Sequence, residues 1–144
     1  MRLPDSVSME DGAALYMVYS TAYYALVHVA KVGPGDVVLV HSAAGGVGCA
    51  AVSICQHFGA KVIATASEAK RNFVRSQGVE HVFDSRSTSW YDEVMRVTNS
   101  KGVTIVLNSL AGIHQKLGIE ALAPSGRCVC MLQIDAIYPL VRRY

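Results

Sequence analysis

Apolar runs of a strand's length alternate with longer, mixed segments along most of this chain. The first run, Val37 to Val40, has no polar interruption, which is typical of a parallel strand buried on both faces. Comparable runs predict further strands at residues 61–65, 81–84, 103–107 and 127–132.

Helices are expected between these strands. The first begins at a capping serine, Ser8, and runs to about Val32, where the turn at residues 33–36, Gly-Pro-Gly-Asp, ends it. Other helices are expected at residues 47–58, 68–77, 90–98 and 113–122, with a turn at 124–126. The alternation predicts an α/β fold: a doubly wound parallel sheet of the Rossmann type, forming one domain over residues 1–144 and truncated before its last strand.

A glycine motif follows the first strand. Ala43, Gly45 and Gly48 have the spacing A-x-G-x-x-G, a variant of the dinucleotide-binding fingerprint. Small residues here allow a tight turn, a close approach of backbone to pyrophosphate, and close packing of the next helix on the sheet. The N-terminus of that helix would direct its amides at the phosphates. The alternative is an ordinary glycine turn without a ligand.

The end of the second strand indicates which dinucleotide is bound. Binders of NADH usually carry an acidic residue there, whereas this chain has Ala66-Ser67, with Lys70 and Arg71 shortly after. A missing carboxylate and two nearby cations favour the 2′-phosphate of NADPH. The alternative is that Lys70 and Arg71 only form the solvated face of a helix.

Composition excludes several classes of function. A net charge of +2 over 144 residues is too small for a nucleic-acid-binding surface, and no apolar segment reaches the length of a membrane span. The N-terminal sequence lacks the pattern of a signal peptide, so a cytoplasmic location is expected.

The cysteines and histidines show no metal-ligand spacing. Cys49, Cys55, Cys128 and Cys130 form no C-x-x-C pair and are expected to be reduced thiols, the last two on one face of a strand. The histidines are dispersed, so no metal site is predicted. His41 ends the first strand beside the expected crevice, where a structural role is favoured over a catalytic one.

Several motifs together resemble one family. SAAGGVG, ATASEAKR, HVFDSRS, GVTIVLNSLAG and LAPSGR are similar to the cofactor-binding domain of the enoyl reductase unit of polyketide synthases and animal-type fatty acid synthases. That family lies in the zinc-free branch of the medium-chain dehydrogenase/reductase superfamily. The likeness extends over nearly the whole chain.

The resemblance implies a reaction and a set of contacts. NADPH would deliver hydride to the β-carbon of an α,β-unsaturated thioester on an acyl carrier protein. Pyrophosphate contacts would come from Gly45, Gly46, Val47 and Gly48, and 2′-phosphate contacts from Ser67, Lys70, Arg71 and Arg86. The nicotinamide side would be lined by Thr21, Asn108, Ser109 and Leu110. The Thr21 hydroxyl could instead bond back into its own helix.

Two departures from the family pattern limit the resemblance. Gln133 replaces the lysine that is the family's candidate proton donor, and an amide cannot act as a general acid near neutral pH. Asp135, which fits the family motif, is a remaining candidate, so the catalytic residues stay unassigned. The substrate-binding domain is expected to be absent, which leaves this fragment inactive on its own.

The parent protein is expected to contain other synthase domains, and the sheet edge suggests a homodimer. Two alternatives remain open: a pseudo-reductase kept as a scaffold or dimerisation element, and the cofactor domain of a stand-alone NADPH quinone oxidoreductase.

Overall fold

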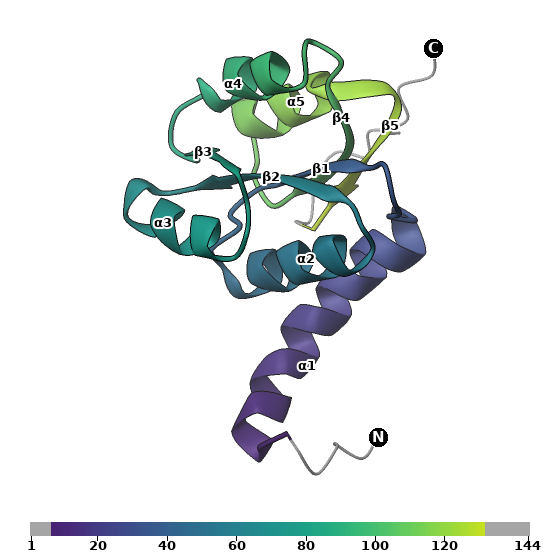
Figure 1. Ribbon diagram of the computed structural model, residues 1–144, viewed down its shortest axis with the longest axis vertical. Helices are drawn as coiled ribbons and strands as arrows, with labels where there is room; N and C mark the ends of the chain where they lie inside the picture. Colours follow the sequence, from purple (N-terminus) through teal and green to yellow (C-terminus); the bar gives the residue numbers. More distant parts are fainter. Residues whose placement is uncertain (1–6, 132–144) are drawn as a thin grey trace.

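Parallel strands in the order β3-β2-β1-β4-β5 form the centre of the computed structural model, which describes residues 7–131 (Figure 1). All four neighbouring pairs of strands are parallel. The strands are β1 (Val37–Val40), β2 (Lys61–Ala66), β3 (His81–Asp84), β4 (Val103–Asn108) and β5 (Leu122–Cys130). The strand order reverses direction at β1, so a crevice is expected between β1 and β4 at their carboxyl ends. The predicted doubly wound α/β sheet is confirmed.

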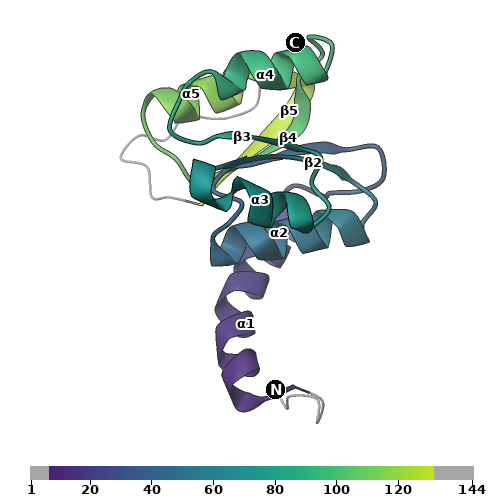
Figure 2. The same cartoon turned by 60° about the vertical axis from the view of Figure 1, so that its left-hand side comes forward.

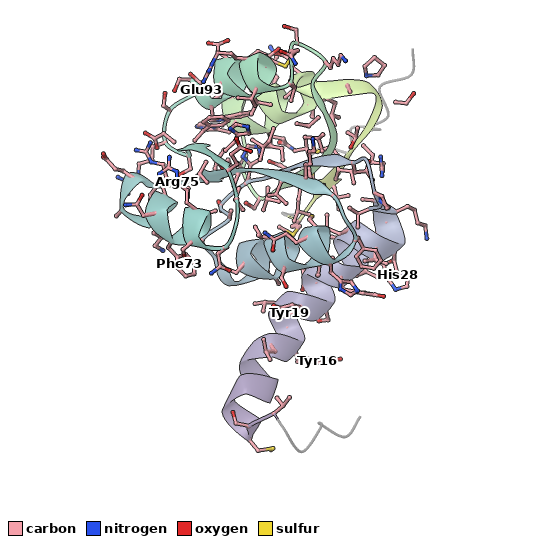
Figure 3. The ribbon with its side chains drawn as sticks, in the orientation of Figure 1. Tyr16, Tyr19, His28, Phe73, Arg75 and Glu93 are labelled. Atoms are coloured by element: carbon pink, nitrogen blue, oxygen red, sulfur yellow. The ribbon has the colours of Figure 1, made fainter. Side chains whose placement is uncertain are left out.

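Helices cover both faces of this sheet. They are α1 (Met9–Tyr23), the π-helix η1 (Tyr24–Val29), α2 (Gly46–His57), α3 (Glu68–Ser76), α4 (Trp90–Val97) and α5 (Ile113–Glu120). Figures 1 and 2 show α2 and α3 on one face and α4 and α5 on the other. The N-terminal part of α1 extends away from this body, and its Tyr16 and Tyr19 side chains are exposed (Figure 3).

Side chains of β1 show why its sequence is apolar throughout. Val38 and Val40 belong to the core beneath α1 and α2, whereas Leu39 belongs to the core that includes Trp90 on the opposite face. All three β1 side chains are fully buried. A strand packed on both faces has no position for a polar side chain, which confirms the prediction made from the uninterrupted run.

The first helix differs from the prediction of one continuous α-helix to about Val32. Its last turns form η1, in which the Ala30 amide donates to the Ala25 carbonyl and the Val32 amide to the Leu26 carbonyl, both at 2.9 Å. The helix itself ends at Val29. A π-turn shifts the register by only one residue, so the apolar period that marks the helix hardly changes and does not reveal it.

The last strand also differs from the prediction. β5 begins at Leu122 rather than Arg127, because the expected turn at residues 124–126 lies inside the strand as a bulge. Val103 pairs with Leu122, but Ile105 already pairs with Arg127. Ser125 takes a positive φ of 62° in this bulge. Residues 124–126 therefore interrupt the strand as predicted, but the sequence did not reveal the pairing of Leu122 with Val103 before them.

Arg127 fixes β5 at the point where its pairing with β4 continues after the bulge. Its guanidinium donates to the carbonyls of Ala30 and Lys31 and contacts the Asp36 carboxylate at 2.9 Å. Burial alone would raise the pKa of Asp36, but hydrogen bonds from Thr104, Arg127 and the Gly33 amide lower it below its usual value. The network therefore joins the residue after η1 to Asp36, which precedes β1, and to Thr104 of β4 and Arg127 of β5.

Helix α2 packs directly on backbone at Gly48. A Cβ placed on this residue would lie 2.5 Å from the Ser42 carbonyl oxygen and 2.6 Å from the Ala43 Cα. Backbone atoms cannot move aside as a flexible side chain can. The third glycine of the motif therefore sets how closely the N-terminus of α2 approaches the loop that leaves β1.

A buried histidine ends β1. His41 Nδ1 lies 3.1 Å from Thr65 Oγ1, and its ring packs edge-on against Trp90 at a centroid distance of 4.8 Å. Its Nε2 atom is buried and has no hydrogen-bond partner among the described residues. Burial, with a smaller contribution from His114, lowers the pKa of His41 from 6.5 to about 4. The imidazole is therefore neutral near pH 7.

We expect Gly48→Ala to lower the free energy of unfolding by about 1–3 kcal/mol, because α2 must shift away from the loop backbone. Chemical denaturation monitored by circular dichroism measures this change. Gly33→Ala is the matched control, since a Cβ at Gly33 would meet nothing within 4 Å. Equal losses in the two variants would contradict the packing argument.

Stability is expected to fall as pH decreases from 6.5 toward 4. The unfolded chain binds a proton at His41 in this window whereas the folded chain does not, which costs the fold up to about 3 kcal/mol. Denaturation at several pH values should show a smaller decrease for His41→Asn, which keeps a polar group near Thr65 but does not titrate. His57→Asn, at an exposed position, should behave like the wild type. An unchanged pH dependence in His41→Asn would rule out His41 as its source.

Candidate cofactor site

The carboxyl ends of the parallel strands bring three of the predicted site segments to one edge of the sheet. The loop from β1 to α2 contains the glycine motif, Ser67 joins β2 to α3, and residues 109–112 join β4 to α5. Figure 1 shows these connections at the same side of the strands. The topology thus brings these three connections together, and contacts of their residues with a nucleotide remain predictions.

The β1–α2 loop leaves the first turn of α2 at the carboxyl end of the sheet. Ser42 adopts a positive φ of 54°, and the Gly45 amide donates to the Ser42 carbonyl at 2.9 Å, which closes a tight turn. Gly45 is the N-cap residue of α2, and no side chain caps this helix. Amides in the first turn of a helix have no intrahelical acceptor, so they remain suited to an anion such as a pyrophosphate.

A pocket of about 220 Å³ lies beside this turn. Polar side chains and small residues from three strand ends line it: Ser42, Ala44, Gly45, Ala66, Ser67, Lys70 and Ser85. Three of the predicted contacts, Gly45, Ser67 and Lys70, are thus brought together. The pocket has one lysine and three serines in its lining but no carboxylate.

Ser85 is a lining residue that the sequence analysis did not single out. Its amide donates to the Ala66 carbonyl at 3.1 Å, which holds the end of β3 against the end of β2. The parallel arrangement could have indicated it, since residues that follow neighbouring parallel strands lie side by side.

The two arginines predicted for the 2′-phosphate do not line this pocket. The Arg71 guanidinium lies 3.8 Å from the Glu68 carboxylate, an interaction within α3. The Arg86 side chain is exposed, and its amide donates to Asp84 Oδ1 at 3.0 Å. Their contacts with a nucleotide remain predictions.

Asn108 shapes the loop after β4. Its buried side chain donates to the Leu110 carbonyl at 2.8 Å and accepts from the Leu110 amide at 3.2 Å. The Ser109 hydroxyl donates to the His41 carbonyl at 3.5 Å, which joins this loop to the end of β1. The side chain of Asn108 is therefore committed to the loop, and a contact with the nicotinamide side remains a prediction for all three residues.

Thr21 lies on α1, facing the carboxyl end of β5. Its hydroxyl donates to the Met17 carbonyl at 2.7 Å, the bond within its own helix that was the stated alternative. The residue also lines a hollow of about 560 Å³ together with Tyr24, Val29 and Cys130.

Gly46 and Val47 lie in the first turn of α2, where Gly46 makes room for Val18 of α1. The catalytic candidates Gln133 and Asp135 lie outside the described residues.

Residues 7–131 contain neither a cluster of metal ligands nor a membrane-spanning helix. No three His, Cys, Asp or Glu side chains there gather closely enough to hold a metal ion. No helix in this range has the length and apolar character needed to cross a membrane.

Comparison with known sequences identifies relatives among polyketide synthases. The profile of the zinc-binding dehydrogenase family matches residues 46–131. A component of the phenolphthiocerol/phthiocerol polyketide synthase of Mycobacterium tuberculosis is 45% identical over 128 residues, which cover 88% of this chain and 6% of that protein. The highly reducing polyketide synthase easB of Emericella nidulans is 43% identical over 146 residues, covering 96% of this chain and 6% of the synthase.

The family description names zinc, and the described residues do not fit a catalytic zinc. Such a site uses three protein ligands, and residues 7–131 contain no group of three. No step of a reaction is therefore assigned to a metal.

Solved structures agree with these relatives. The CurK enoyl reductase superposes with a TM-score of 0.92 and 41% identity over 96% of this chain and 42% of that one. The nucleotide-binding subdomain of the enoyl reductase domain of PpsC from Mycobacterium tuberculosis gives a TM-score of 0.75 and 49% identity, covering 78% and 63%. The family profile spans this chain from the first turn of α2 through β5, so the chain belongs to the zinc-binding dehydrogenase family.

Proposed function

We propose that this chain binds NADPH for an enoyl reductase that reduces α,β-unsaturated acyl thioesters on an acyl carrier protein during polyketide or fatty acid synthesis. The observation that carries the choice of cofactor is the pocket at the end of β2, which has a lysine and three serines in its lining but no carboxylate.

The charges around this pocket favour a phosphate over a hydroxyl. Lys70 supplies a cation, and Ser67 and Ser85 supply hydroxyl donors from two neighbouring strand ends. Two acids adjoin the lining residues in sequence: Glu68 is 92% exposed at its side chain and faces Arg71, and Asp84 accepts from the Arg86 amide. Within the lining a 2′-phosphate would therefore meet donors and no carboxylate, whereas a 2′-hydroxyl would lack its usual carboxylate acceptor.

The backbone of the glycine turn suits the rest of the dinucleotide. Gly45 and Gly48 leave no Cβ between the loop and the first turn of α2, which would receive the pyrophosphate through its amides. Asn108 keeps the loop after β4 in one shape, so the neighbouring wall of the crevice is preorganised.

NADPH supplies a hydride when bound, and the part of this chain is to hold and orient the cofactor. The chain spans 6% of the synthases that it matches and 42% of the CurK reductase. Reduction of the thioester needs a substrate pocket across the crevice, so negligible turnover is expected from this chain alone. The other synthase domains and the acyl carrier protein are partners within this proposal.

Two further properties belong to the proposal. Strand β5 ends the sheet among the described residues, and pairing of its edge with a second copy would form a homodimer. The free thiols suit the reducing conditions of the cytoplasm.

Lys70→Ala should weaken NADPH binding about 10-fold and leave NADH binding nearly unchanged, because only the 2′-phosphate would lose its ionic partner. A titration of nucleotide fluorescence with the purified chain measures both affinities. Lys101→Ala is the matched control, since this lysine lies in a different pocket, before the amino end of β4.

Equal weakening of NADPH and NADH in Lys70→Ala would contradict the assignment of the 2′-phosphate. Absence of binding by the folded wild-type chain would favour the pseudo-reductase alternative, which the replacement of a candidate proton donor by Gln133 first suggested.

A further inference from the structure

A buried hydroxyl lies near the carboxyl end of β2. Thr65 is fully buried, and its neighbours in the strand, Ile63, Ala64 and Ala66, are apolar. Valine has nearly the same shape as threonine and suits a strand buried on both faces better. A hydroxyl in such a place is normally retained through the hydrogen bonds that it makes.

Thr65 contacts three consecutive residues of the chain that leaves β1. Its Oγ1 atom accepts from the Ser42 amide at 3.4 Å and lies 3.1 Å from His41 Nδ1. Its carbonyl accepts from the Ala43 amide at 3.0 Å. The end of β2 thus fixes the chain at the point where it passes from β1 into the glycine turn.

The residue that the hydroxyl holds has an uncommon backbone conformation. Ser42 has a positive φ of 54°, which a residue with a side chain retains only where several contacts impose it. Its carbonyl accepts from the Gly45 amide at 2.9 Å, and its amide donates to Thr65. Ser42 is exposed, so these hydrogen bonds rather than side-chain packing hold the turn.

The first turn of α2 packs on the same two loop residues that Thr65 holds. A Cβ at Gly48 would lie 2.5 Å from the Ser42 carbonyl oxygen and 2.6 Å from the Ala43 Cα. The Cys49 thiol donates to the Ala43 carbonyl at 3.4 Å. A displacement of Ser42 would therefore also displace the amides of α2 that would receive the pyrophosphate.

We propose that Thr65 is a positioning residue for the pyrophosphate end of the nucleotide site, where its hydroxyl holds Ser42 in the turn that presents the first amides of α2. This inference rests on the proposed binding of NADPH. Because Thr65 is fully buried, it acts through Ser42 and not on the nucleotide itself. The pyrophosphate is common to NADPH and NADH, so Thr65 contributes equally to the binding of both, unlike Lys70.

Thr65→Val removes the hydroxyl and keeps the carbonyl that accepts from Ala43. It should weaken NADPH and NADH binding by the same factor, about 10-fold, whereas Thr65→Ser keeps the hydroxyl and should stay within about 2-fold of the wild type. Titrations of nucleotide fluorescence with each purified 144-residue chain measure these affinities. In the nucleotide-free chain, the Ser42 amide should exchange its hydrogen faster in Thr65→Val than in Thr65→Ser.

Thr104→Val is the matched control, because this threonine also joins neighbouring segments through its hydroxyl. On β4, at the opposite end of the sheet, Thr104 Oγ1 accepts from the Val37 amide and donates to the Asp36 carboxylate. The control variant should lower the free energy of unfolding and leave both nucleotide affinities unchanged. Circular dichroism checks that each variant is folded.

Unchanged affinities in folded Thr65→Val, or a loss confined to NADPH, would overturn the proposal. A loss in Thr65→Ser or in Thr104→Val equal to that in Thr65→Val would also overturn it, because the effect would then not depend on this hydroxyl. Any of these results, together with NADPH binding by the wild type, would leave the proposed cofactor in place. Absence of binding by the wild type would instead contradict the proposed function and this inference with it.

Discussion

The contact between the first turn of α2 and the backbone of the β1–α2 loop is the constraint on which the site depends. At Gly48 there is no room for a Cβ, since backbone atoms of Ser42 and Ala43 would lie within 3 Å of it. Two positions earlier in the same turn, a Cβ on Gly46 would lie 2.8 Å from Val18 Cγ1 of α1. The absence of a Cβ at Gly46 and Gly48 therefore lets the loop, α2 and α1 pack closely together. This packing places the N-terminus of α2 at the carboxyl end of the sheet.

Polar groups at the strand ends hold the loops around this contact. His41 contacts Thr65 between the ends of β1 and β2, and Asn108 closes the loop after β4 on Leu110. At the opposite end of the sheet, Arg127 and Asp36 fix η1 against β1 and β5. Each of these side chains satisfies buried or half-buried polar groups, so the apolar strands between them need supply only packing.

The fold was largely predictable because the strands have buried, uninterrupted sequences and glycine or proline marks several turns. The features that were missed change pairing without changing hydrophobicity. The π-turn of η1 alters the helix register by one residue, and the bulge at residues 123–126 joins two strand segments that the sequence separates by a turn. Neither alters which residues are apolar, so the pattern carries no trace of them.

The site could be predicted where it depends on the spacing of motifs along the chain, and less well where it depends on the orientation of individual side chains. Gly45, Ser67 and Lys70 meet because parallel strands end at one edge, which the order of the motifs implies. Ser85 joins them from the end of the neighbouring strand β3. Arg71 instead lies near Glu68, an i, i+3 contact that the helical spacing could have indicated.

The most direct test of the central claim is a map of backbone amide shifts in a ¹⁵N-labelled sample titrated with NADP⁺. If the crevice binds the nucleotide as proposed, the largest shifts will be at Gly45, Gly46, Gly48 and Ser67, with smaller changes at the amino ends of the strands. Shifts centred instead on Lys61 and Lys101, which line a different pocket at the amino ends of β2 and β4, would contradict the account.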